Sequence, residues 1–116
     1  GDPLVDFAYS TLTWRMPGAG FRGLAGVDIA SLGIPSEAEY IAEYCRLAGV
    51  EVGSDGRPAH WNTYLVFNLF RLAAILQGVL ARALAGNAAS SKGAEMGRQA
   101  VPLAELAWAI AQKEAP

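Results

Sequence analysis

The amino-acid sequence predicts an all-α protein with four to five helices around one long, largely buried central helix. Apolar residues recur at the three- and four-residue spacing of helices, and no segment shows the alternation that is typical of strands. Residues that favour helix starts and helix ends flank the same segments. Hydrophobic residues make up 53% of the 116 residues, which is enough for the core of a single helical domain spanning residues 1–116.

Charge and cysteine content exclude several classes of function. The net charge of −2 provides no basic surface, so we expect neither nucleic acid nor an anionic membrane as a partner. Cys45 is the one cysteine, which excludes a disulfide within the chain and fits a cytoplasmic location. The apolar run at 72–81 is shorter than the ~20 residues that a membrane-spanning helix needs. Charged residues make up only 17% of the chain, which suggests additional burial against a partner or another part of the protein.

The first helix is expected from about Pro3 to Trp14, because Asp2 is a good N-cap and proline suits the first turn. Asp6 lies one turn further on, still close to the positive end of this helix. The glycine- and proline-rich stretch at 17–35 predicts a loop with one helical turn after Val27. It contains no GKS or GKT and follows no strand, so it does not predict a phosphate-binding loop.

Two further helices follow from capping signals. Ser36 and Glu39 form a capping-box pattern before a helix that Gly49 ends, and Ile41, Cys45 and Ala48 share one face of it. A free cysteine on an apolar face is usually a small core residue. The final helix is expected from about residue 88 or 90 to 113, with a kink or break near residue 100 caused by a proline two residues later.

The long helix is predicted from about Ala59 to Ala85, opened by a proline and ended by glycine and asparagine. Its only charges between residues 61 and 84 are Arg71 and Arg82, and a helix that is apolar nearly all round is expected to be buried. His60 is the single histidine, placed in the first turn of this helix. With no histidine or cysteine partner it predicts no metal site, and with no orienting acid it is a poor general base.

One face of the long helix could line a polar pocket. Trp61, Tyr64, Asn68 and Arg71 follow at spacings of three, four and three residues, which places them on the same side. The simpler interpretation, which we favour at this stage, is structural. In it Arg71 pairs with an acid from another helix and Asn68 bonds a loop carbonyl, because buried polar groups are nearly always paired.

The order of four stretches resembles one known family. GDPLVDFAY, IPSEAEYIAEYCRLAG, WNTYLVFNLFRLAAILQGVLARALAGNAAS and AVPLAELAW are similar to the C-terminal helices of the aminoglycoside phosphotransferase-like family, small-molecule kinases related in fold to protein kinases. They resemble in particular the subgroup related to the kinase-like domains fused to acyl-CoA dehydrogenases. The resemblance implies a fragment of the C-terminal lobe of a kinase-like fold, whose parent transfers a phosphoryl group from ATP, with Mg²⁺, to a small-molecule hydroxyl.

The resemblance also implies roles for particular residues. The nucleotide-binding lobe and catalytic loop would lie upstream of Gly1 in a missing N-terminal part, so we expect no catalytic residue, metal ligand or cofactor site in this chain and no activity in isolation. Asp6 matches the aspartate that braces the catalytic loop, and Asp2 would cap the same helix. Tyr64, Asn68 and Arg71 become a candidate wall of the acceptor-substrate site.

Two alternatives remain open at the level of sequence. The chain could be a non-enzymatic helical interaction domain whose surplus of apolar residues serves a homodimer. It could also be a helical ligand-binding domain that uses the face carrying Arg71. A fragment should show uncovered apolar surface around the first helix and along one side of the long helix, whereas a complete domain should not.

Overall fold

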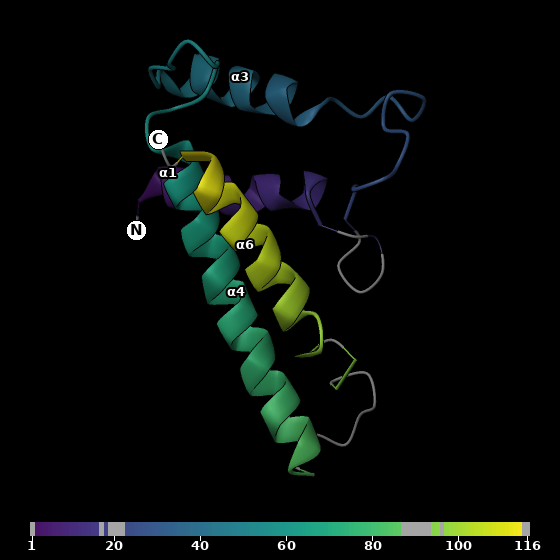
Figure 1. Ribbon diagram of the computed structural model, residues 1–116. Helices are drawn as coiled ribbons and strands as arrows, with labels where there is room; N and C mark the ends of the chain where they lie inside the picture. Colours follow the sequence, from purple (N-terminus) through teal and green to yellow (C-terminus); the bar gives the residue numbers. More distant parts are fainter. Residues whose placement is uncertain (1, 17, 19–22, 87–93, 96, 115–116) are drawn as a thin grey trace. The chain divides into compact units, whose positions relative to one another are not determined.

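The computed structural model describes residues 2–16, 18, 23–86, 94–95 and 97–114. Its helices are α1 (Pro3–Thr11), the 3-10 helix η1 (Leu12–Trp14), α3 (Glu37–Ala48), α4 (Trp61–Leu84) and α6 (Ala100–Glu114) (Figure 1). The described residues include no strand, which confirms the predicted all-α class with its long helix. They divide into two compact units, up to Trp61 and from Asn62 on, and each is described by itself.

The start of α1 is fixed by its first residues. The Leu4 amide donates to Asp2 Oδ1 at 2.8 Å, and Pro3 is the first helical residue, as predicted. The α-helical hydrogen-bond pattern ends at Thr11 and the chain tightens into η1, so the last predicted turn is a 3-10 helix. After Val27, where one helical turn was predicted, residues 29–33 form hydrogen-bonded turns: the Leu32 amide donates to the Ile29 carbonyl and the Gly33 amide to the Ala30 carbonyl, but no helix continues from them.

The start and end of α3 also follow the local sequence. The Glu39 amide donates to Ser36 Oγ at 3.1 Å, and the Ser36 amide donates to Glu39 Oε1 at 3.3 Å, which completes the predicted capping box. Gly49 ends the helix with φ of 71°, a left-handed conformation that glycine adopts without steric cost. Ile41 and Cys45 are buried, but the predicted third member of that face, Ala48, is exposed.

Aromatic rings join α1 to α3 within the first unit. Phe7 is buried and stacks on Tyr44 with ring centroids 3.6 Å apart, and on Tyr40 at 5.3 Å. Trp14 contacts the Tyr40 ring at 4.7 Å and donates its indole N–H to the Pro35 carbonyl at 3.0 Å. Both tyrosines are half-buried. This stack holds the two helices against each other.

A second link within this unit is an ion cluster that the sequence analysis did not anticipate. Arg15 donates to both carboxylate oxygens of Glu37, with Nε–Oε2 at 2.9 Å and a terminal nitrogen–Oε1 at 2.8 Å. Arg57 reaches the same Oε1 at 3.4 Å. The Glu37 and Arg15 side chains are only 15% and 20% exposed, so water screens this pair less than a surface pair.

We expect Glu37→Gln to lower the free energy of unfolding by about 1–3 kcal/mol, because two arginines then lose their charged acceptor. Glu43→Gln is the matched control, because Glu43 pairs with Arg46 on the exposed side of the same helix, and its loss should lower stability much less than that of Glu37. Urea unfolding followed by circular dichroism measures both variants. Equal losses for the two would show that the cluster contributes no more than a surface pair.

The long helix α4 begins at Trp61 instead of at the predicted Ala59. His60 has φ of 61°, in the left-handed region, so it cannot form the first helical turn in which the sequence analysis placed it. Within the helix, Leu65, Leu69 and Leu76 form a buried stripe along one side. On the opposite side Phe67 is 54% exposed, so the residues that the structure describes leave this side uncovered.

By length and composition alone, α4 is also apolar enough to cross a membrane, and 28% of its most apolar window is buried within the chain. One such helix is weak evidence, because the core helix of a water-soluble protein meets the same criterion. The expectation that the protein has no membrane partner stays a prediction.

In the second unit, α6 runs beside α4 in the opposite direction (Figure 1). It begins at Ala100 after a turn at 98–99, and helical residues at 94–95 and 97 precede that turn, so the chain breaks near residue 100 as predicted. Pro102 lies in the first turn of α6, where a missing amide leaves no helical bond unmade. Residues 88–93, where this last segment was expected to begin, lie outside the described residues.

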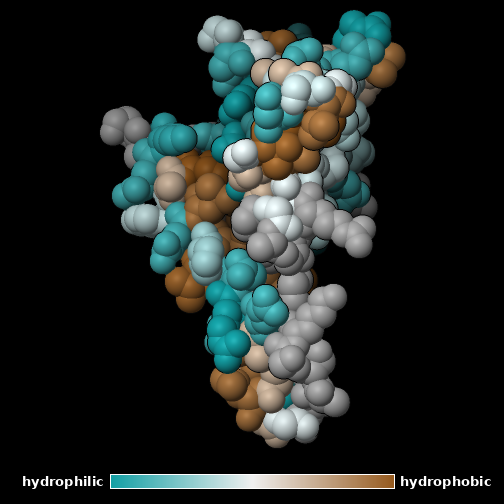
Figure 2. All heavy atoms as spheres, turned by 90° about the vertical axis from the view of Figure 1, so that its right-hand side faces the viewer, coloured by the Kyte–Doolittle hydropathy of each residue, from teal (hydrophilic) through white to brown (hydrophobic). Residues whose placement is uncertain are grey.

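Apolar side chains reach the surface at several points of the chain. Figure 2 shows them at the lowest tip of the view, where α4 ends, and Leu84 in that turn is 71% exposed. Tyr9 of α1 is 46% exposed, and Phe67 lies uncovered on one side of α4. Exposed apolar residues therefore occur on α1 and along one side of α4, and equally on α3 and α6, where Leu47 and Trp108 are 71% and 62% exposed. Their distribution does not distinguish a fragment from a complete domain.

Candidate functional site

The candidate wall on α4 combines a buried amide with more accessible side chains. Asn68 is fully buried, Tyr64 is half-buried and Arg71 is exposed, all on the same side of the helix by their spacing. The side chains on this polar side of the helix therefore differ in burial. Such a side can hold one amide rigidly while keeping a phenol and a guanidinium accessible.

Arg71 does not have the acidic partner that the structural interpretation gave it. Its guanidinium carbon lies 5.8 Å from the centroid of the Phe67 ring, which is a cation–π contact. Among the described residues it forms no ion pair, so that part of the structural interpretation is wrong there. The spacing of four residues between Phe67 and Arg71 was the sequence signal for this contact. The charge of Arg71 consequently stays available to a ligand or a partner.

Trp61 opens the same helix and is 2% exposed. Its ring lies 5.7 Å from that of Phe7, but its indole N–H has no hydrogen-bond partner among the described residues. A buried donor without an acceptor costs about 1–3 kcal/mol. The beginning of α4 therefore holds a polar group that a carbonyl or carboxylate from outside the described residues would satisfy.

The two aspartates at the start of α1 differ in what they contact. Asp2 is occupied as the N-cap of the helix. Asp6 is exposed in the first turn, and its carboxylate makes no hydrogen bond or ion pair within the described part of the chain. A free carboxylate beside a helix N-terminus can accept amide hydrogens from a neighbouring loop.

The remaining candidate residues, Cys45 and His60, show no sign of a catalytic or metal-binding role. Burial raises the pKa of the Cys45 thiol, which keeps it protonated and weakly nucleophilic, as expected of a core residue. His60 is exposed in the turn that precedes α4. No three histidine, cysteine, aspartate or glutamate side chains of the described residues are close enough together to hold a metal ion. Chemistry based on a resident metal therefore has no ligand set there.

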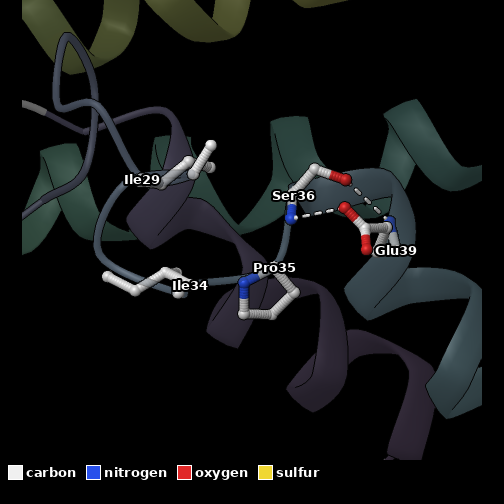
Figure 3. A pocket seen from close by; sticks show the side chains of 7 residues that line it. Ile29, Ile34, Pro35, Ser36 and Glu39 are labelled. Atoms are coloured by element: carbon white, nitrogen blue, oxygen red, sulfur yellow. Dashed lines mark hydrogen bonds between the residues drawn. The ribbon is translucent and has the colours of Figure 1, made fainter.

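A hollow of about 390 Å³ lies where the loop at 29–35 meets the start of α3. Figure 3 shows Ile29, Ile34 and Pro35 around it, with the Ser36 and Glu39 side chains joined to each other's backbone amides. Because these two polar side chains already serve the capping box, the hollow has few groups left for a ligand. It is a weaker candidate than the polar side of α4.

Comparison with known proteins relates these features to a family. No protein-family model matches the chain. It is 41% identical to mouse acyl-CoA dehydrogenase family member 10, over 98% of this chain and 10% of that protein. It is 32% identical to human acyl-CoA dehydrogenase family member 11, over 97% of this chain and 14% of that protein. The chain thus spans a small part of the curated relatives that it matches.

A solved structure is similar over the whole chain. It comes from Ralstonia eutropha, is assigned as an aminoglycoside phosphotransferase, and is 41% identical with a TM-score of 0.86, covering 100% of this chain and 34% of that one. The chain is a phosphotransferase-like helical region. The resemblance to the aminoglycoside phosphotransferase-like subgroup related to acyl-CoA dehydrogenase fusions is thereby confirmed. The roles of Asp2, Asp6, Tyr64, Asn68 and Arg71 in this phosphotransferase-like region stay predictions.

Proposed function

We propose that this phosphotransferase-like region belongs to a cytoplasmic enzyme that transfers a phosphoryl group from ATP to the hydroxyl of a small molecule. The observation that carries the proposal is the similarity of the whole chain, at 41% identity and a TM-score of 0.86, to the Ralstonia protein. In that protein the matched part is 34% of the chain. The proposal places the acceptor wall in this region and the phosphoryl-transfer machinery in the rest of the enzyme.

The described residues do not by themselves fit Mg²⁺ or ATP. They contain no cluster of three acidic or histidine side chains, and phosphoryl transfer depends on positioned magnesium and a nucleotide cradle. In the proposal both are bound by the rest of the enzyme, outside the region that this chain represents, and the 116-residue chain alone is inactive. No step of the reaction is therefore assigned to a residue of this chain.

The polar side of α4 would hold the acceptor. The Asn68 amide is fully buried, so it would support the wall from behind without touching the acceptor itself. The Tyr64 phenol can donate a hydrogen bond, and the exposed Arg71 guanidinium can attract an anionic group such as a carboxylate. This set favours a small polar or anionic acceptor, including a hydroxy acid or its thioester.

The two aspartates of α1 would act through the backbone. Asp2 caps the beginning of α1. Asp6, in the first turn of the same helix, would accept hydrogen bonds from backbone amides of the catalytic loop. A positioning residue of this kind keeps reacting groups within the small tolerance that transfer needs. It touches neither nucleotide nor acceptor.

The test compares the 116-residue chain with the whole natural protein. Mg-ATP should raise the melting temperature of the whole protein and leave that of the chain unchanged, and the chain should show no ATP turnover. Once an acceptor is found, Arg71→Ala should raise its KM about tenfold while the KM for ATP stays constant. Arg82→Ala, an exposed arginine on the same helix, is the control and should change neither. Turnover by the chain alone, or a whole protein indifferent to Mg-ATP, would contradict the proposal.

A further inference from the structure

We draw no further inference here: the strongest candidate, the shallow apolar groove of about 300 Å³ between α4 and α6 in the second unit, is an unpartnered apolar face, and nothing in the structure shows what covers it.

Discussion

Gly97→Ala is expected to lower the free energy of unfolding by about 3 kcal/mol, near the upper end of the usual cost of overpacking. Gly97 is buried against α4, and a Cβ atom at this position would lie 2.5 Å from Leu80 Cβ and 2.7 Å from both Leu80 Cα and N. Two of these three atoms belong to the backbone of α4, which cannot rotate away as a side chain can. The added methyl group must therefore push the segment before α6 off the long helix.

Gly78→Ala separates this collision from the general effect of removing a glycine. Gly78 lies inside α4, and its nearest neighbour for an added Cβ is a terminal nitrogen of the flexible Arg82 side chain at 3.4 Å. Alanine there should stabilise the helix by up to about 1 kcal/mol, because it restricts the unfolded chain. Thermal and urea unfolding measure both variants. A Gly97→Ala protein as stable as Gly78→Ala would show that the segment around residue 97 does not pack on α4.

The features that could be predicted from the sequence depend on residues close together in the chain. The capping box of Ser36 and Glu39 and the N-cap of Asp2 involve groups within three residues, and the structure confirms both. The break before α6 was predictable for the same reason, because a proline acts on the turn that precedes it. The start of α4 was placed too early because nothing in the sequence around His60 specifies a left-handed conformation.

Features that depend on distant residues were missed. Glu37 meets arginines that are 22 and 20 residues away in the sequence, and no periodicity relates such positions. The prediction that Arg71 pairs with an acid failed among the described residues, where the guanidinium instead contacts the ring of Phe67, one helical turn earlier. The resemblance to phosphotransferases succeeded because it compares whole stretches of sequence, and it identifies the kind of protein without testing the role of any one residue.

The properties of α4 explain how one helix can serve both the core and a binding wall. Its buried stripe of leucines, Leu65, Leu69 and Leu76, anchors it in the chain, and Tyr64 and Asn68 lie on a neighbouring side. The proposed acceptor wall consequently requires that α4 be held rigidly by its leucine stripe.

Leu69→Ala tests that requirement and is expected to lower the free energy of unfolding by about 2–5 kcal/mol. Leu69 is fully buried in the middle of α4, so truncating it removes apolar contacts and leaves a cavity that the surrounding helices fill only in part. Leu84→Ala makes the same chemical change on the same helix at a side chain that is 71% exposed, and it should alter stability by at most about 0.5 kcal/mol. Urea unfolding of both variants measures the difference, and the dependence of the unfolding free energy on urea concentration is compared between them. If the two substitutions cost the same, the buried stripe does not anchor α4, and the proposed acceptor wall could not rely on it as a rigid support.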